Sequence, residues 1–502
     1  MSREARRHEG TKARRADDPG AQAIADRCKA ARRVLEFVGQ AHVLARFDGL
    51  DAAAQDRLLS QIESIDWDEV ADLIESHVRR APRVSLPRHI EPAPLYPNEP
   101  TGELPSKYAE ARRLGEELVR DGKVAAFTVA GGQGTRLGWD APKGTFAATP
   151  VRHLSLFEVM AQFIQKVQRK YRTVVPWYIM TSPANDADTR RFFQQHEHFA
   201  LDPSHVMLFA QGMMPAIGMV DSKVLLAAPD SLALSPNGHG GSLRALHRSG
   251  ALDDMLKRGI EHISYTQIDN PHVRVVDPLF VGLHGLDGCR MSSKAVLKTR
   301  PDEKVGVFCV ADGKLTVIEY SDMPADMLEA RDDHGLLRFS AGSIAIHAIR
   351  VDFVAALNRD GGAGLPFHRA EKKVPFFDPE SGRTVQPDEP NAVKLEMFVF
   401  DALPLCDRSI VYETDRVEEF APIKNADAPK VEDSVDSPAT SRRLQTQRAA
   451  RWLESHGVRI PRTPKGRVDA TIEVTHLTAV EAADLGEVEL PDSIEPGSEV
   501  VI

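Results

Sequence analysis

A buried strand followed directly by a glycine-rich loop is the feature that most limits how this chain can fold. VAAFTVA, residues 124–130, is a continuous apolar run typical of a strand buried on both faces. The segment AGGQGTRLGWDAPKG at 130–144 follows, with glycines at Gly131, Gly132 and Gly134. Glycines allow a sharp turn in which bare backbone N–H groups form an anion-binding concavity. The loop therefore predicts a phosphate site at the end of a buried strand.

Two common phosphate loops are excluded by the spacing of this one. A dinucleotide-binding G-x-G-x-x-G motif starting at Gly132 requires a glycine at the position of Leu137. A Walker A loop requires G-K-[ST], whereas the order here is Pro142-Lys143-Gly144. Lys143 and Arg136 add two cations to the loop. A flexible connection with no ligand is the alternative reading, and these cations argue against it.

Further apolar runs indicate the fold class. Runs at 177–182, 205–210 and 262–269 repeat the pattern of a buried strand, and helical segments such as 156–171 lie between them. Strands that alternate with helices predict parallel crossovers and an open α/β sheet with ligands at the carboxyl ends of its strands. We expect a Rossmann-like, mixed and mostly parallel sheet.

The chain divides into four expected segments. Residues 1–20 are charged and predict a disordered tail, and 21–104 predict a helical region that ends in a proline-rich linker. Residues 105–400 carry the α/β domain, and the looser pattern of 401–502 predicts a small C-terminal domain.

Several helix ends in these segments can be assigned from single residues. Asp51 is expected to cap a helix whose apolar face includes Leu58, Leu59 and Ile62. Gly122 is expected to end a helix over 107–120. In the C-terminal segment we expect one helix over 441–455 and a strand in VDATIEVT, residues 468–475.

The composition excludes several classes of partner. A net charge of −10 and a pI near 6.0 argue against nucleic acid, although local lysines can still bind a polyphosphate. No apolar run approaches the roughly 20 residues of a membrane helix, so no membrane partner is expected. Four cysteines without a C-x-x-C pair, and an N-terminus without an apolar secretory segment, predict a cytoplasmic protein.

The loop GGQGTRLG followed by PKG resembles the signature of the eukaryotic-type UDP-sugar pyrophosphorylases, most closely the UDP-N-acetylhexosamine pyrophosphorylases. The resemblance runs from GQAHVLARFDGL near residue 40 to PIKNAD at 422–427, whereas the last sixty to seventy residues match poorly. It implies a nucleotide-diphospho-sugar transferase fold of the GT-A-like type, with 105–400 as the catalytic nucleotidyltransferase domain. The implied reaction joins UTP to a sugar 1-phosphate and releases pyrophosphate, with Mg²⁺ as cofactor; the oligomeric state is not implied.

The same resemblance assigns roles to residues along the chain. Arg136, Lys143 and Lys424 match positions that stabilise the transferred phosphate. Gln211 matches the glutamine that reads uracil, and Asp269 the aspartate that contacts the metal. The remaining matches are nucleotide contacts at Gly131, Gly132, Gly134, Thr135, Lys143, Gly238 and Lys394, and sugar contacts at His239, Glu319, Tyr320, Ser343 and Lys424.

Two of the sugar positions depart from the N-acetylhexosamine pattern. His239 stands where that pattern has the second asparagine of N-G-N-G-G, and Ser343 stands where it has the asparagine of G-N-I. N-acetylglucosamine 1-phosphate is the first expectation, and glucose or galactose 1-phosphate is an alternative. A non-catalytic sensor that binds UDP-sugar and an enzyme that uses another nucleotide base are further alternatives.

Overall fold

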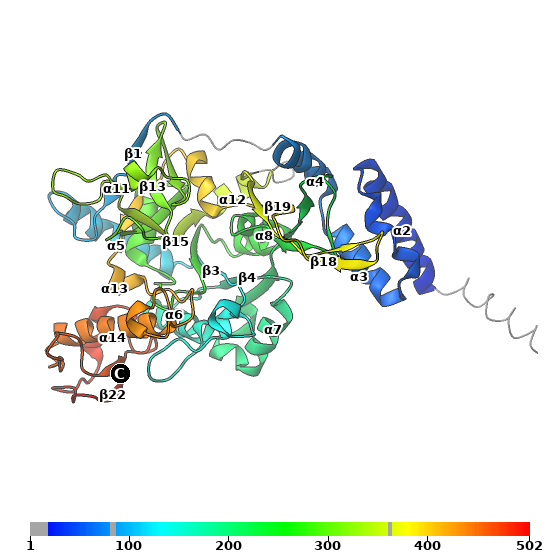
Figure 1. Ribbon diagram of the computed structural model, residues 1–502. Helices are drawn as coiled ribbons and strands as arrows, with labels where there is room; N and C mark the ends of the chain where they lie inside the picture. Colours follow the sequence, from blue (N-terminus) through cyan, green and yellow to red (C-terminus); the bar gives the residue numbers. More distant parts are fainter. Residues whose placement is uncertain (1–18, 81–86, 360–363) are drawn as a thin grey trace, which may run out of the picture. The chain divides into compact units, whose positions relative to one another are not determined.

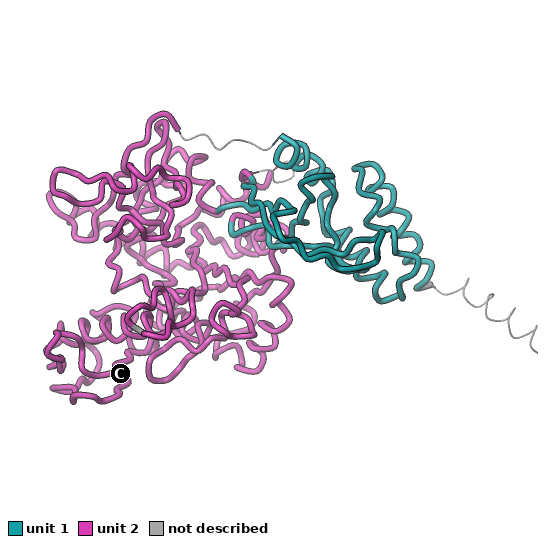
Figure 2. Tube along the Cα trace, in the orientation of Figure 1, with its two compact units in different colours: residues 1–86, 212–239, 367–398 teal, residues 87–211, 240–366, 399–502 magenta. Residues whose placement is uncertain are grey.

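The computed structural model describes residues 19–80, 87–359 and 364–502 (Figure 1), so most of the expected tail at 1–20 lies outside the described residues. Two compact units are distinguished in Figure 2. Unit 1 holds the described residues up to 86 together with 212–239 and 367–398. Unit 2 holds 87–211, 240–366 and 399–502.

These units divide the chain differently from the expected segments. Residues 212–239 and 367–398 come from the expected catalytic segment, yet they belong to unit 1, because apolar side chains such as Ile217 and Leu226 pack with Leu58 and Leu59 in one core. The C-terminal residues 401–502 belong to unit 2.

Unit 2 is built on a mixed sheet with a parallel centre, as predicted. Its strands run in the order β2-β20-β12-β15-β11-β3-β4-β5, and β11, β3, β4 and β5 are mutually parallel. These four strands are the four apolar runs of the sequence. The strands of this sheet are β1 (Ile90–Pro92), β2 (Leu95–Tyr96), β3 (Val124–Val129), β4 (Trp177–Thr181), β5 (Val206–Ala210), β11 (His262–Gln267), β12 (Met291–Leu297), β13 (Val307–Ala311), β14 (Lys314–Ile318), β15 (Ala341–Arg350) and β20 (Val411–Glu413).

Helices connect and cover these strands. α6 follows β3, and α7 follows β4, as expected for parallel crossovers. No helix of the described residues is long and apolar enough to cross a membrane. The helices of unit 2 are α5 (Leu104–Arg120), α6 (Leu156–Tyr171), α7 (Asp186–Gln195), α8 (Gly241–Arg248), α9 (Ala251–Lys257), α10 (Pro278–Leu286), α11 (Ala325–Glu329), α12 (Val351–Leu357), α13 (Arg416–Glu419) and α14 (Pro438–Ser455).

Unit 1 combines helices with short antiparallel strands. The Asp51 carboxylate accepts a hydrogen bond from the amide of Ala54 at 2.8 Å, so the predicted cap of α3 is confirmed. The predicted apolar face of α3 is buried as well. The elements of this unit are α2 (Pro19–Phe37), α3 (Ala52–Glu63), α4 (Trp67–Leu73), β6 (Met213–Pro215), β7 (Ile217–Gly218), β8 (Leu226–Ala228), β9 (Ser231–Leu232), β10 (Leu234–Pro236), β16 (His368–Lys372), β17 (Phe376–Asp378), β18 (Arg383–Val385) and β19 (Ala392–Glu396).

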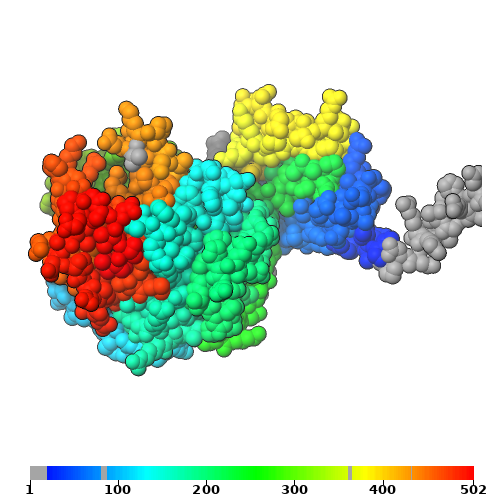
Figure 3. All heavy atoms as spheres, turned by 90° about the horizontal axis from the view of Figure 1, so that it is seen from below, coloured from blue at the N-terminus to red at the C-terminus, as the bar shows by residue number. Residues whose placement is uncertain are grey.

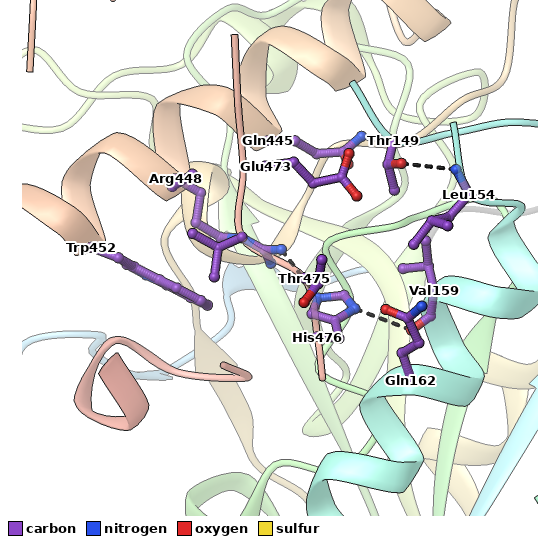
Figure 4. A pocket seen from close by; sticks show the side chains of 12 residues that line it. Thr149, Leu154, Val159, Gln162, Gln445, Arg448, Trp452, Glu473, Thr475 and His476 are labelled. Atoms are coloured by element: carbon purple, nitrogen blue, oxygen red, sulfur yellow. Dashed lines mark hydrogen bonds between the residues drawn. The ribbon is translucent and has the colours of Figure 1, made fainter. Parts of the chain in front are cut away.

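The C-terminal residues join unit 2 through α14, β21 (Thr471–Glu473) and β22 (Glu499–Val501), so the predicted helix and strand are confirmed. Figure 4 shows the joint between β21 and α6. One oxygen of the buried Glu473 carboxylate accepts hydrogen bonds from the amides of Val151 and Arg152 at 2.9 and 2.8 Å. The His476 ring is hydrogen-bonded through Nδ1 to the Val159 carbonyl oxygen at 3.1 Å and through Nε2 to the Arg448 guanidinium at 3.2 Å (Figure 4). Buried polar contacts of this kind fix the joint in one arrangement.

Two glycines let α5 and α10 cross at very short range. A Cβ atom on Gly115 would lie 1.7 Å from the Pro278 carbonyl oxygen, and one on Gly282 would lie 1.7 Å from that of Ala111. Because both obstacles are backbone atoms, neither helix can yield locally. The loop after α5 also needs glycine, because Gly122 has φ +67° and ends this helix as predicted.

Gly282→Ala is expected to destabilise the protein by about 3 kcal/mol, because the added methyl group forces the two helices apart. Gly285→Ala in the same helix is the matched control, since its Cβ would make only ordinary contacts with side chains, Leu118 at 3.5 Å, Leu114 at 3.6 Å and His262 at 4.0 Å. The midpoint of thermal unfolding should fall for Gly282→Ala and stay nearly constant for Gly285→Ala. An equal decrease for both variants would contradict the role of the close crossing.

Candidate active site

The ends of two neighbouring parallel strands place the glycine loop beside Asp269. β3 pairs with β11, Val129 opposite Gln267, and the loop leaves β3 while Asp269 follows β11. The Nζ atom of Lys143 lies 4.0 Å from an Oδ atom of Asp269, and both side chains are about 15% exposed. β4 and β5 lie on one side of β3, and β11 on the other. Open α/β sheets bind ligands at such a point, where the strand order reverses.

Internal contacts hold the loop in one folded conformation. The Gly134 amide donates to the Ala141 carbonyl at 2.9 Å, and the Lys143 amide donates to that of Gly132 at 3.1 Å. A Cβ atom on Gly134 would lie within 2.8 Å of Trp139, so the turn requires glycine there. Among the described residues, no group accepts a hydrogen bond from the amides of Gly131 and Gly132. These two amides are therefore available to an anion.

The side chain of Asn185 holds the glycine loop in place through hydrogen bonds to its backbone. The sequence alone does not identify Asn185 as a residue of the site. Its buried side chain donates to the carbonyls of Ala130 and Gly132 at 3.0 and 3.3 Å and accepts from the Ser182 amide at 2.8 Å. Asparagine just before a helix is a recognisable turn signal, here ahead of α7, but the partner of that turn is not visible in the sequence.

Gln211 follows β5 and lies against the loop. Its backbone amide donates to the Thr181 carbonyl at 2.9 Å, which fixes where the side chain leaves the sheet. A Cβ atom on Gly131 would lie 2.9 Å from the Gln211 side-chain nitrogen. Gly131 is thus required for the buried Gln211 carboxamide to pack directly against the loop backbone.

Lys424 is held beside Asp269 by two further backbone contacts. The Ile423 amide donates to the Asp269 carbonyl at 2.8 Å, and the Lys424 amide donates to the Asp436 carbonyl at 2.6 Å. The Lys424 Nζ atom lies 3.9 Å from an Oδ atom of Asp436. Burial raises the pKa of Asp436 above its ordinary value; the Lys424 and Arg416 charges lower it, and that of Asp269 adds to the increase.

Residues of an irregularity in β15 line a small cavity beside these groups. The pairing with β12 shifts between Ser293 and Ala295, and Ala345 of β15 has a left-handed backbone with φ +55°. Bulges of this kind re-aim side chains next to functional sites. The resulting cavity, about 60 Å³, is lined by Ser343 and Ala345 together with Asp269 and Lys424.

The predicted sugar contacts that follow β14 and the one in β15 are near neighbours. The Ser343 amide donates to the Gly306 carbonyl at 2.8 Å, and a Cβ atom on Gly306 would lie 3.1 Å from a Glu319 carboxylate oxygen. Tyr320 follows Glu319 and is 40% exposed. Within unit 2 the structure therefore brings Glu319 close to Ser343, which borders the cavity of Asp269 and Lys424.

A buried ion cluster lies behind the Asp269 segment. The fully buried Lys294 contacts Asp277 at 2.6 Å and both oxygens of Glu419 at 2.6 and 2.7 Å. Burial alone would raise the pKa of Asp277, but Lys294 and Arg274 hold it well below its ordinary value. The Asn270 side chain donates a hydrogen bond to the Glu419 carbonyl at 2.7 Å. The cluster therefore joins the segment that leads to Lys424 to the segment that follows Asp269.

Three predicted residues belong to unit 1. Gly238 has φ +82°, and a Cβ atom on it would lie 2.4 Å from the Met397 carbonyl oxygen, so glycine is required there. Lys394 lies on β19 and is half-buried. Burial and the neighbouring His368 lower the pKa of His239 to about 4, so its imidazole is neutral at pH 7.

Arg136 and Thr135 lie on a short 3-10 turn, Thr135–Leu137, and both are exposed. Within the described part of the chain, Arg136 has no carboxylate within 4 Å. Unit 2 thus combines free amides, a free guanidinium, two lysines and a carboxylate, a set suited to binding phosphate groups.

Comparison with known proteins gives the family of the chain. A sequence model described as UTP–glucose-1-phosphate uridylyltransferase matches residues 60–457. A human UDP-N-acetylhexosamine pyrophosphorylase-like protein 1 is 35% identical over 457 residues, covering 86% of this chain and 88% of that protein. The UDP-N-acetylglucosamine pyrophosphorylase of Saccharomyces cerevisiae is 34% identical over 432 residues, covering 84% and 90%.

Solved structures share the fold. The UDP-N-acetylglucosamine pyrophosphorylase from Trypanosoma brucei superposes with a TM-score of 0.78 at 24% identity, covering 93% of this chain and 98% of that one. A Leishmania major UDP-glucose pyrophosphorylase superposes with a TM-score of 0.58 at 17% identity, covering 84% and 82%. The predicted fold class is therefore confirmed.

Asn185→Asp is expected to weaken UTP binding about tenfold or more, because a carboxylate would face two carbonyl oxygens and release the glycine loop. Asn358→Asp is the matched control, since the Asn358 amide also donates to two carbonyls, at 3.1 and 2.8 Å. Calorimetric titration with UTP, alongside thermal unfolding, should show lost stability in both variants and lost affinity in Asn185→Asp alone. Equal affinity losses would contradict this role of Asn185.

Proposed function

The chain belongs to the UTP–glucose-1-phosphate uridylyltransferase family, and we propose that it transfers the uridylyl group of UTP to N-acetylglucosamine 1-phosphate. The observation that carries the choice of sugar is the 34–36% identity, over most of the chain, to relatives named for N-acetylated hexosamines. The products would be UDP-N-acetylglucosamine and pyrophosphate.

The reaction places few demands on proton transfer. A phosphate oxygen of the sugar 1-phosphate attacks the α-phosphorus of UTP; the new P–O bond forms as the bond to the bridging oxygen breaks. Pyrophosphate leaves with the electron pair of that bond. Because the nucleophile is already an anion, no general base is required, and the protein must align two polyanions and offset their repulsion.

The cations of unit 2 match this demand. The free amides of the loop and Lys143 would bind the triphosphate, while Lys424, which lines a cavity together with Asp269, would bind the sugar phosphate. Arg136 is exposed and free of carboxylates among the described residues, so it can stabilise the leaving pyrophosphate. Fixed charges of this kind contribute more to the transition state than mobile water does.

Asp269 fits the part of a magnesium ligand. Its carboxylate lies at the carboxyl end of β11 beside Lys143, and no group of three or more metal-binding side chains occurs among the residues that the structure describes. Mg²⁺ commonly takes one or two protein carboxylates and completes its shell with water and phosphate oxygens. When bound there, Mg²⁺ would neutralise phosphate charge and orient the phosphates for in-line transfer.

The base and sugar contacts complete the proposal. The Gln211 carboxamide offers one donor and one acceptor, complementary to uracil N3–H and O4. Gly238 and Lys394 of unit 1 are proposed nucleotide contacts, and Glu319 and Tyr320 are proposed sugar contacts. A neutral His239 can donate and accept a hydrogen bond, as the asparagine of the N-acetylhexosamine pattern can.

Glucose or galactose 1-phosphate is the second candidate substrate. His239 and Ser343 both replace asparagines at sugar positions, and Ser343 is too short to reach where an asparagine amide would. The retained cations favour an enzyme over a sensor that only binds UDP-sugar. The cytoplasm is the proposed compartment, in keeping with four buried, unpaired cysteines in the described residues.

Arg136→Ala is expected to lower the rate of pyrophosphate release roughly 10³-fold or more, as for other side chains that stabilise a transferring phosphoryl group. Arg113→Ala is the control, because Arg113 is exposed and, among the described residues, pairs only with Glu117 on its own helix. Near-normal turnover of Arg136→Ala would remove Arg136 from the catalytic set.

Pyrophosphate release with UTP and Mg²⁺ should give the highest kcat/KM with N-acetylglucosamine 1-phosphate among the N-acetylglucosamine, N-acetylgalactosamine, glucose and galactose 1-phosphates. Ser343→Asn should increase the preference for the N-acetylated sugar about tenfold, because it restores one hydrogen-bonding side chain. Equal or better use of glucose or galactose 1-phosphate would replace the proposed substrate, and absent turnover with all four would contradict the proposed reaction.

A further inference from the structure

A basic cavity between α14 and a C-terminal turn takes no part in the proposed reaction. It has a volume of about 790 Å³ and lies within unit 2. Arg442 and Arg443 of α14 line one side, and Arg462, Lys465 and Arg467 of the turn line the other. An isolated antiparallel β-bridge between Arg462 and Val468 closes the turn. Gly466, with a φ of +75°, allows the chain to reverse its direction.

The charges of this cavity are unbalanced. Five cations but only two carboxylates, Glu432 and Glu499, line it, which gives a net charge of +3 in a chain whose net charge is −10. Arg462 is neutralised by Glu454 at 2.6 Å. In the described parts of the chain, no carboxylate lies within 4 Å of the other four cations, Arg442, Arg443, Lys465 and Arg467.

We propose that this cavity binds a small molecule that carries two or more phosphate groups. Its volume is within the range of small-ligand sites, roughly 300–1,000 Å³. The four cations without a carboxylate partner among the described residues come from two separate elements, α14 and the turn, which suits a ligand with a phosphate group for each. Three of these four cations are arginines, and a guanidinium group can bind two phosphate oxygens at once. The acidic character of the chain as a whole disfavours a nucleic acid in the same place.

None of the residues that line this cavity is assigned to the catalytic site. Lys465 and Arg467 lie beyond residue 457, where the family match ends. The helix that carries Arg442 nevertheless contacts the chain after the glycine loop, because Arg442 donates to the Ala147 carbonyl at 2.9 Å and Gln445 to that of Ala148 at 3.0 Å. Figure 3 shows the C-terminal residues, in red, beside the cyan residues around 150. A ligand here would therefore sit on the helix that supports the loop segment.

The test is a calorimetric titration of the full chain with fructose 1,6-bisphosphate, with and without saturating UDP-N-acetylglucosamine. We expect a dissociation constant of about 10–100 μM that is unaffected by the nucleotide sugar and rises with salt. Glucose 6-phosphate, with one phosphate group, should bind about tenfold more weakly or worse. Binding that the nucleotide sugar abolishes would assign the ligand to the catalytic site and overturn the proposal.

Arg443→Glu combined with Lys465→Glu should weaken the bisphosphate at least about tenfold, because two ion pairs become repulsive. Both side chains are exposed, so the variant should fold. Arg32→Glu with Arg33→Glu, on exposed positions of α2, is the matched control. Unchanged binding in the cavity variant, equal binding of the monophosphate, or no binding of either probe would overturn the proposal. Pyrophosphate release by the cavity variant tests the proposed function separately, since none of these residues belongs to the catalytic set.

Discussion

The parallel pairing of β3 with β11 is the constraint on which the candidate site depends. It brings two segments that are distant in the sequence, the glycine loop and Asp269, to the same edge of the sheet. Strand pairing fixes the two strand ends next to each other. The hydrogen bonds of Asn185 to the loop, and the backbone hydrogen bond from Ile423 to Asp269, then place the loop and Lys424 relative to that edge. The positions of the charged groups thus follow from backbone hydrogen bonds, which do not reorganise when phosphate charge shifts.

The site also relies on charges that a ligand never reaches. Lys294 is fully buried with Asp277 and Glu419, and such a cluster is stable only when every member keeps its partner. The cluster helps to position Asp269, because the side chain of the adjacent Asn270 donates a hydrogen bond to the Glu419 carbonyl. The exposed or half-buried cations proposed to bind substrate have the opposite character. Arg136 lacks a carboxylate partner among the described residues, so phosphate can bind it without first breaking an ion pair.

The sequence predicts the features of this protein that depend on local patterns. Four apolar runs become the four parallel strands, and Asp51 and Gly122 occupy the helix ends assigned to them. What it misses depends on distant pairing. The strands of unit 1 are only two to five residues long, too short for a detectable alternation, and they complete a core begun more than 150 residues earlier. The left-handed Ala345 is equally invisible, because alanine has no preference for that conformation and the bulge in β15 imposes it.

The discontinuity of unit 1 has a consequence for how the chain emerges from the ribosome. Leu58, Leu59 and Ile62 of α3 are synthesised early, but the core that they belong to is completed by β19, which ends at Glu396. Until β19 is synthesised, this core contains α2, α3, α4 and the strands from β6 to β10, but it lacks the side chains of Val393 and Leu395. The core of unit 1 therefore stays incomplete through most of translation, and a premature stop before β19 would leave part of it exposed.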